Sequence, residues 1–337
     1  MSEEVSAVRL AQDLIRLNTI NPPGNEAQAI SLVGSILERI GFRVKTYEMS
    51  PQRTSLIADL PGQDNLPPLC FTGHLDTVGL GTIPWSVDPF GGEIRDGKVY
   101  GRGSTDMKGG IAAIVAAAAN VSGGSHTSLK LVFTAGEESG CEGAQHLAHL
   151  GVLGETRAIV VAEPTLNKPL LGHRGATWLA IKVSGKAAHG SMPERGENAI
   201  VKAAALIGEI NKIGFDVPPH LHLGGSSINV GYCHGGNNIN VVPDLAEIGV
   251  DVRTTPNLDG REVKRKIASI SGTAETTTIM DLSSVYTAPD NDWFRKVVAI
   301  VEAVSGTELV PTVAPYFTDA AGLAPAYGNP PLVSLGP

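Results

Sequence analysis

The sequence predicts an α/β protein into which a smaller α+β domain is inserted. In the first half, segments with apolar residues at helical spacing alternate with short apolar strands, which is typical of a layered domain with a largely parallel sheet. From about Trp178 the order becomes strand, helix, strand, strand, helix, strand, which is the ferredoxin-like pattern. A helix and a strand after about Pro289 return to the first domain. We therefore expect a first domain at residues 1–173 and 288–337 and an inserted domain at residues 174–287.

Apolar spacing places the elements of the first domain. Residues 3–17 and 26–41 have helical spacing, and the second segment ends at Gly41, as a C-cap would. An Ala-rich helix is expected after Lys108. Strands are expected at residues 54–60, 68–74, 130–136 and 158–164.

The same reading places the elements of the inserted domain and of the return segment. In the inserted domain, strands are expected at residues 178–185, 226–235, 247–253 and 275–284, and helices at residues 198–211 and 259–270. The return segment comprises a helix at residues 292–306 and a strand at residues 331–336.

Composition excludes several classes of partner. The 337 residues carry a net charge of −8 and no run of Lys and Arg, which argues against nucleic acid and anionic membranes. The acidic N-terminus does not have the pattern of a secretory signal, and the longest apolar helical block, residues 111–119, is too short to cross a bilayer. The three cysteines lack CxxC spacing and are expected to be buried thiols in a reducing compartment. We therefore expect a cytoplasmic protein.

Acidic and imidazole side chains follow the ends of the strands expected in the first domain, and one more precedes the Ala-rich helix. They are His74, Asp76, Asp106, Glu137, Glu138 and Glu163. Sites in open α/β sheets form beyond the carboxyl ends of the strands, so these groups are expected to converge. Arg102 and Lys108 are the only nearby cations, which are too few for five carboxylates. Each residue alone is more often a cap or turn residue, but together they favour a pair of divalent cations.

The spacing within this set indicates different tasks for neighbouring residues. His74 and Asp76 are two apart, so in an extended segment both point the same way, and Asp76 can orient the imidazole. Glu137 and Glu138 are adjacent and therefore face opposite ways. One can bind a metal ion while the other acts as a base toward water.

Five stretches of the sequence together resemble one family of dinuclear zinc metallohydrolases. They are "GHLDTV", "WSVDPFGGEIRDGKVYGRGSTDMKGG", "TAGEESGCEGAQ", "VVAEPT" and "GKAAHGSMPERGENAI". The family includes succinyl-diaminopimelate desuccinylase, acetylornithine deacetylase, aminoacylase and glutamate carboxypeptidase. The resemblance covers nearly the whole chain with the stretches in the family's order. It implies a zinc-peptidase-like α/β/α catalytic domain with an inserted ferredoxin-like lid that is used for dimerisation.

The resemblance implies a ligand set for two zinc ions per chain. His74 and Glu163 would bind one ion, Glu138 would bind the second, and Asp106 would bridge them. Ligand type alone does not separate zinc from cobalt or manganese.

Roles in catalysis and substrate binding also follow from the resemblance. Glu137 would be the general base and later the acid, and Asp76 would lie behind His74. In the lid, His189 would reach the active site of the partner subunit in a homodimer and stabilise the oxyanion, while Asn240 and Arg253 would bind the substrate carboxylate. From the residues alone, His189 is a loop histidine, Asn240 a turn residue and Arg253 a surface charge.

One ligand of the family is absent from this sequence. The family has a histidine after a strand that ends in "GPG", whereas this sequence ends at "PLVSLGP", and no histidine follows His234. We expect either that the chain is truncated there or that water or another group replaces the histidine. His173 is not the expected replacement, because the family tends to have a basic residue in its segment, "LLGHRGATW".

The expected activity is hydrolysis of the amide bond of an N-acyl amino acid, with a di- or tripeptidase or a carboxypeptidase of the same family as the alternative. A non-catalytic protein that binds metal or ligand is a further alternative, because of the absent histidine. The Gly-rich loop "YGRGSTDMKGG" enters a helix as a phosphate-binding loop would, but it has neither GxGxxG nor GxxxxGK[ST], which argues against a phosphate site.

Overall fold

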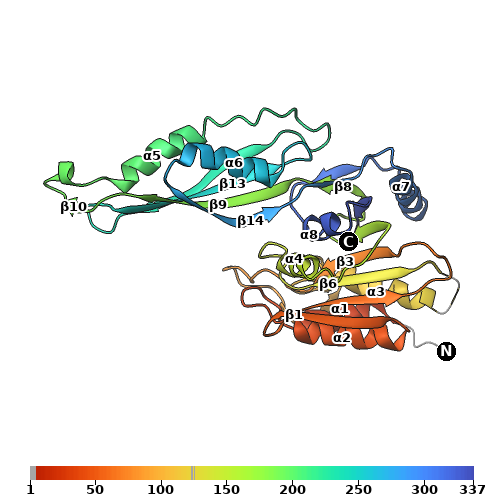
Figure 1. Ribbon diagram of the computed structural model, residues 1–337. Helices are drawn as coiled ribbons and strands as arrows, with labels where there is room; N and C mark the ends of the chain where they lie inside the picture. Colours follow the sequence, from red (N-terminus) through yellow and green to blue (C-terminus); the bar gives the residue numbers. More distant parts are fainter. Residues whose placement is uncertain (1–4, 123, 125) are drawn as a thin grey trace. The chain divides into compact units, whose positions relative to one another are not determined.

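The computed structural model describes residues 5–122, 124 and 126–337, and these divide into two compact units (Figure 1). The first unit comprises the chain up to Gly172 together with Val285–Pro337, and the second comprises His173–Ser284. The helix predicted at residues 3–17 is observed as α1, Ala7–Arg16, although its first two predicted residues lie outside the described part. Among the helices of the described residues, none combines the length and the apolar character that crossing a membrane requires.

A mixed sheet forms the centre of the first unit, in the order β1-β2-β6-β3-β7-β17-β8-β15, with β16 paired to β8. The strand bounds are β1 Arg43–Ser50, β2 Arg53–Leu60, β3 Leu69–His74, β6 Leu129–Thr134, β7 Ala158–Val161, β8 Leu170–His173, β15 Val285–Tyr286, β16 Thr312–Ala314 and β17 Leu332–Ser334. Neighbours within β6-β3-β7-β17 are parallel. The largely parallel sheet that the sequence predicts is therefore confined to the centre. The β1-β2 and β2-β6 pairs are antiparallel, and a tight turn between β1 and β2 permits no other pairing.

Helices cover this sheet and bury a continuous core. Their bounds are α1 Ala7–Arg16, α2 Ala27–Arg39, α3 Lys108–Ser122, α4 Glu142–His149, α7 Asp292–Ser305 and α8 Ala320–Ala326. The largest cluster joins Leu14 of α1, Val33 of α2 and Val115 of α3 to Leu56 and Phe133 of the sheet, all of them fully buried. A short hairpin of β4, Glu93–Arg95, and β5, Lys98–Tyr100, lies in the loop before α3.

A close approach between α3 and the segment after β7 positions the start of α3. A Cβ atom at Gly110 would lie 2.5 Å from the main-chain oxygen of Ala162, so only glycine leaves room there. Asp106, just before α3, is thereby brought toward Glu163, just after β7.

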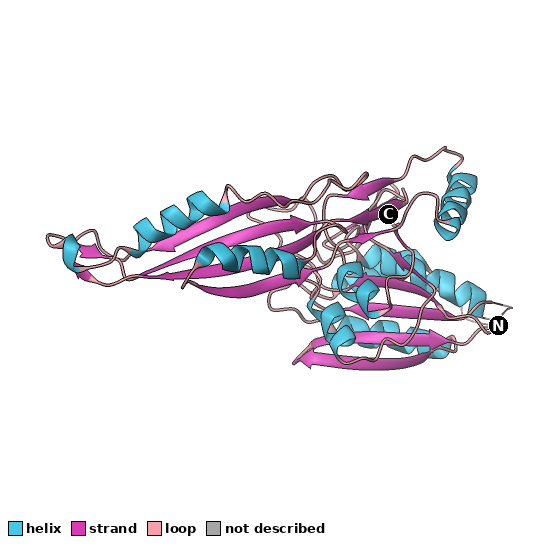
Figure 2. Ribbon diagram, turned by 45° about the horizontal axis from the view of Figure 1, so that its top comes forward, coloured by secondary structure: helices cyan, strands magenta, loops and turns pink. Residues whose placement is uncertain are grey.

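The second unit has the ferredoxin-like pattern that the sequence predicts. Its elements are β9 Gly175–Ser184, α5 Ala199–Ile210, β11 Ser227–Gly235, β13 Leu245–Thr254, α6 Gly260–Ser271 and β14 Glu275–Leu282. The strands pair in the order β11-β13-β9-β14, and every pair is antiparallel. Both helices contribute to one core with β9 and β13, and Figure 2 shows α5 and α6 along this sheet. A separate short pair joins β10, Ala188–His189, to β12, Val241–Val242.

Candidate metal centre

The candidate centre lies at the carboxyl ends of three neighbouring parallel strands. His74 is the last residue of β3, Glu137 and Glu138 follow β6, and Glu163 follows β7. Because β6, β3 and β7 are adjacent and parallel, with His74 paired to Thr134, their carboxyl ends meet at one edge of the sheet. The sheet order thus explains why residues far apart in the sequence converge.

Three of the four predicted metal ligands form a compact donor group. His74, Asp106 and Glu163 each offer one ligand atom, and these atoms all lie within 4.8 Å of one another. His74 and Glu163 are buried, whereas the Asp106 side chain is about half exposed. Glu138, the fourth predicted ligand, is not in this group. One imidazole nitrogen and two carboxylates suit zinc and related divalent metals.

The hydrogen bonds of His74 test whether the residues fit a metal ion. Its Nδ1 is 3.0 Å from the main-chain oxygen of Asp76, which can only accept, so Nδ1 carries a proton. Its Nε2 is 3.0 Å from Oδ1 of Asp106. Burial alone would lower the pKa of His74, but hydrogen bonds to Asp106 and Asp76 raise this pKa well above 6.5. A cation is therefore favoured beside Asp106, either a proton on Nε2 or a metal ion bound by Nε2. The donor set fits a metal.

Asp76 is the structural anchor of the glutamate pair. Its Oδ1 accepts a hydrogen bond from the main-chain N–H of Glu137 at 3.0 Å, and its Oδ2 accepts one from the N–H of Glu138 at 3.1 Å. Asn21 also donates to Oδ2, at 2.9 Å. Asp76 is fully buried, and its pKa is lowered because these bonds and His74 outweigh the effect of burial. Besides lying beside His74, as the sequence predicts, Asp76 thus fixes the backbone that carries Glu137 and Glu138.

Burial raises the pKa values of the glutamates at the centre. Glu137 is 6% exposed, and burial raises its pKa well above 4.5, with the charge of Glu163 adding to the effect. Burial likewise raises the pKa of Glu163 to about 8 and raises that of the half-buried Glu138. Groups of this kind hold protons unless positive charge is supplied.

The two nearby basic residues do not supply that charge directly. Lys108 is fully buried and donates from Nζ to the main-chain oxygen of Leu17 at 2.8 Å, and burial lowers its pKa to about 8. Arg102 donates to the main-chain oxygen of Gly79 and lies over the ring of Trp85. In the described part of the chain, neither forms an ion pair with the carboxylates of the donor group.

One buried acid near the centre is not predicted from the sequence. Asp319 is 1% exposed at the start of α8, and its Oδ2 accepts a hydrogen bond from Oγ1 of Thr134 on β6. Burial raises its pKa to about 6, and its charge raises the pKa of Glu137 and Glu163. The signal was "YFTDAAG", which reads as an ordinary helix cap, although Asp319 makes no side-chain capping bond.

In the second unit, the structure brings together His189, the predicted oxyanion-stabilising residue, and Asn240, one of the two predicted substrate-binding residues. The N–H of Gly190, next to His189, donates to the main-chain oxygen of Asn240 at 2.7 Å. His189 is exposed, and its Nδ1 is hydrogen-bonded to Oγ of Ser191 at 2.7 Å. Both residues are thus available on one surface of this unit.

Arg253 lies at the other end of β13. It pairs with Ala176 and Ser227, and its Nε donates to Oδ2 of Asp251 at 3.1 Å. From Leu245, close to the β10-β12 pair, β13 runs about 26 Å to Arg253 at about 3.3 Å per residue. One copy of the chain therefore cannot place Asn240 and Arg253 on the same small carboxylate.

We expect the metal-free protein to become less stable as the pH rises from about 5 to about 8. Folded Glu26 and Glu163 have pKa values raised to about 7 and about 8 by burial, against 4.5 in the unfolded chain. The folded state therefore binds more protons in this window, and each loss of a proton costs stability. The raised pKa of His74 acts in the same direction.

Urea unfolding at a series of pH values in the presence of a chelator measures this trend. Added zinc should remove the part that comes from Glu163 and His74 and leave the part that comes from Glu26, which is not a proposed ligand. A free energy of unfolding that rises across the same window would contradict the assignment.

Comparisons with known proteins agree with this geometry. The model of Peptidase family M20/M25/M40 matches residues 70–337. A probable succinyl-diaminopimelate desuccinylase of Staphylococcus epidermidis is 30% identical over 292 residues, which are 77% of this chain and 71% of that protein.

Solved structures share the fold. A tripeptidase from Staphylococcus aureus has a TM-score of 0.74 at 21% identity, and the match covers 100% of this chain and 90% of the tripeptidase chain. A second solved structure is a Bacillus subtilis protein described as a dinuclear metal binding peptidase of the M20 family. Its TM-score is 0.68 at 18% identity, and the match covers 98% of this chain and 88% of the Bacillus subtilis chain. The chain therefore belongs to Peptidase family M20/M25/M40, a family of metal-dependent hydrolases that act on amide bonds.

Proposed function

We propose that this protein hydrolyses the amide bond of an N-acyl amino acid and releases a carboxylic acid and a free amine. The observation that carries the proposal is the donor group of His74, Asp106 and Glu163, with the buried Glu137 on the neighbouring strand end. The similarity to a desuccinylase over most of the chain supports an N-acyl substrate. A di- or tripeptidase or a carboxypeptidase is the second candidate, favoured by the fold shared with a tripeptidase.

The metal ions would be held by residues at the three strand ends and before α3. We assign His74 and Glu163 to one ion, Glu138 to a second, and Asp106 to both, and we propose zinc, for which cobalt or manganese could substitute. Such ions, when bound, polarise an amide carbonyl and lower the pKa of a water molecule. The added charge would also allow Glu137 and Glu163 to ionise near neutral pH, since burial otherwise keeps them protonated.

Glu137 is the proposed general base. Its backbone is held by Asp76, and its carboxyl is buried beside the donor group, so it is placed to take a proton from the attacking water. The same proton is then given to the leaving nitrogen, which releases the amine. Nδ1 of His74 stays protonated and donates its hydrogen bond to the main-chain oxygen of Asp76 throughout the reaction. This bond fixes the ring so that Nε2 faces Asp106.

We assign the first unit to catalysis and the second to a lid that also forms a homodimer. His189 would stabilise the oxyanion, and Asn240 and Arg253 would bind the substrate carboxylate. The length of β13, which begins at Leu245 a few residues after Asn240 and carries Arg253 near its other end, supports the dimer. Both residues can act on one small substrate only if they come from different copies.

The proposal is tested by measuring metal content and hydrolysis on the same preparation. After equilibration with zinc and removal of excess, elemental analysis should give two zinc ions per chain. Hydrolysis should then be faster for N-succinyl or N-acetyl amino acids than for dipeptides or tripeptides. A higher kcat/KM for the peptides would favour the second candidate, and metal-loaded protein that hydrolyses neither class would overturn both.

A further inference from the structure

The segment that carries the glutamate pair is held from two sides. This glutamate turn, residues 136–142, is closed internally by N–H groups of Gly140 and Cys141 that donate to the main-chain oxygen of Glu137. On its inner side, Asp76 accepts hydrogen bonds from the N–H groups of Glu137 and Glu138. The outer side of the turn needs a separate contact, because the hydrogen bonds of Asp76 reach the turn only at the N–H groups of Glu137 and Glu138.

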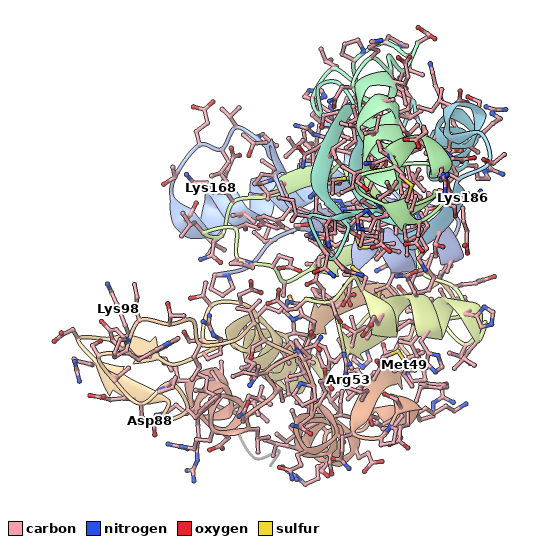
Figure 3. The ribbon with its side chains drawn as sticks, turned by 90° about the vertical axis from the view of Figure 1, so that its left-hand side faces the viewer. Met49, Arg53, Asp88, Lys98, Lys168 and Lys186 are labelled. Carbon is pink, nitrogen blue, oxygen red and sulfur yellow. The ribbon has the colours of Figure 1, made fainter. Side chains whose placement is uncertain are left out.

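Arg53 holds the outer side. Its side chain is 11% exposed, and its Nη2 donates to Oε2 of Glu142 at 3.2 Å. Its Nε bonds both carboxylate oxygens of Glu26, which is fully buried, at 3.1 and 3.2 Å. Figure 3 labels Arg53 close to Met49, on the β1–β2 hairpin. Arg53 therefore ties the end of the glutamate turn to β2 and to the residue that precedes α2.

The fit between Arg53 and the glutamate turn is close. Gly136, the first residue of the turn, has a φ of 73°, and a Cβ atom there would lie 2.5 Å from Nη2 of Arg53. The guanidinium thus lies directly against the backbone that leads into Glu137. A side chain at position 136 would displace it.

A chain of hydrogen bonds connects this outer tie back to Asp76. Oε2 of Glu142 accepts from Oγ of Ser139 at 2.9 Å, and Ser139 in turn accepts from Nδ2 of Asn21 at 2.8 Å. The same Nδ2 donates to Oδ2 of Asp76 at 2.9 Å. Asp76 and Arg53 therefore belong to one continuous hydrogen-bond network, which contacts the glutamate turn at both of its ends.

We propose that Arg53 and Asn21 are positioning residues that hold Glu137 and Glu138 in fixed places at the metal centre. The proposal rests on the proposed function for the roles of the two glutamates. Arg53 suits this task because its guanidinium is hydrogen-bonded to the carboxyl groups of Glu26 and Glu142, so it leaves the carboxylates of the donor group free for metal. A planar fork can hold two carboxylates at once, which a lysine ammonium does less well.

The test compares Arg53→Met with Arg157→Met in otherwise unchanged full-length protein. Arg157 is a matched control because it also forms a partly buried ion pair in the first unit, with Asp64, but lies at the amino end of β7. Hydrogen exchange of the Glu137 and Glu138 amides is measured on the metal-free protein, with the β3 amides as reference for global unfolding. We expect exchange in the glutamate turn to be about tenfold faster in Arg53→Met alone, with β3 unchanged.

The second measurement is of kcat and KM on the zinc-loaded protein. Arg53→Met should lower kcat about tenfold or more and change KM by less than about twofold, and Arg53→Lys should recover part of the loss. Glu142→Ala, at a side chain that is 42% exposed, should give the same pattern without risk to folding.

Two outcomes would overturn the positioning role. The first is an equal rate of amide hydrogen exchange in the glutamate turn of Arg53→Met, Glu142→Ala and Arg157→Met. The second is a rise in the KM of Arg53→Met with kcat unchanged. If no chain, including the unsubstituted one, hydrolyses any substrate, only the proposed function fails. The exchange measurement still decides whether Arg53 positions the turn.

Discussion

Replacing Glu137 by glutamine is expected to lower kcat by roughly 10²–10⁴-fold, the range that a positioned general base contributes. Glutamine keeps the size and shape of the side chain but cannot accept a proton from water. Glu137 is proposed as the base and not as a ligand of either ion, so the metal content should be unchanged. The N–H bond from residue 137 to Asp76 involves the main chain and is retained.

The measurement is kcat together with zinc content, and Glu155→Gln, at an exposed glutamate of the first unit, is the control. Glu138→Gln provides the contrast within the pair, because it should lose metal as well as activity. If Glu137→Gln kept full activity with its metal in place, the general-base role would be wrong. If it lost metal, Glu137 would be a ligand.

The sequence predicts most of the elements that build the centre because their signals are local. The strands before His74, Glu137 and Glu163 are short apolar runs, and the helix after Asp106 is rich in alanine. These three strands and this helix each lie within a few residues of their predicted positions. Parallel order then brings the strand ends together, which is a general property of such sheets.

What the sequence does not show depends on contacts between distant segments. The antiparallel flank formed by β1 was not predicted, because its residues alternate weakly between half-buried and exposed positions. Asp319 lies near the centre because the start of α8 contacts Thr134 of β6, and Arg53 lies near it because β2 and β6 are neighbours in the sheet. Neither "FTDA" nor "PQRT" signals these contacts. Such residues are found only when the tertiary fold is known.

The lid residues illustrate a different limit. The family resemblance assigns His189, Asn240 and Arg253 to one substrate. Their positions in the sequence do not show whether they come from one copy of the chain or from two. The length of β13 does, because it keeps Arg253 about 26 Å from the Leu245 end at about 3.3 Å per residue. A shared task for these residues therefore implies two copies of the chain, a conclusion that depends on strand geometry.

Replacing Asp106 by asparagine is expected to weaken zinc binding by more than about 100-fold, the upper end of the loss seen for residues that only support a ligand. Asp106 is the donor that faces Nε2 of His74, at 3.0 Å, and it is assigned to both ions. The substitution keeps its shape and removes one negative charge from the centre. Because the side chain is 49% exposed, the fold should tolerate the change.

Competition with a chromophoric chelator measures the affinity, and Asp290→Asn, at an exposed aspartate of the same unit, is the control. Asp106→Asn and Glu137→Gln should differ in their response to added zinc. Activity of Asp106→Asn should rise with zinc concentration, because its defect is mainly one of occupancy, whereas Glu137→Gln should stay slow at any concentration. An Asp106→Asn protein that binds two zinc ions with unchanged affinity would show that the bridging position belongs to another residue. The donor group of His74, Asp106 and Glu163 would then have to be reassigned.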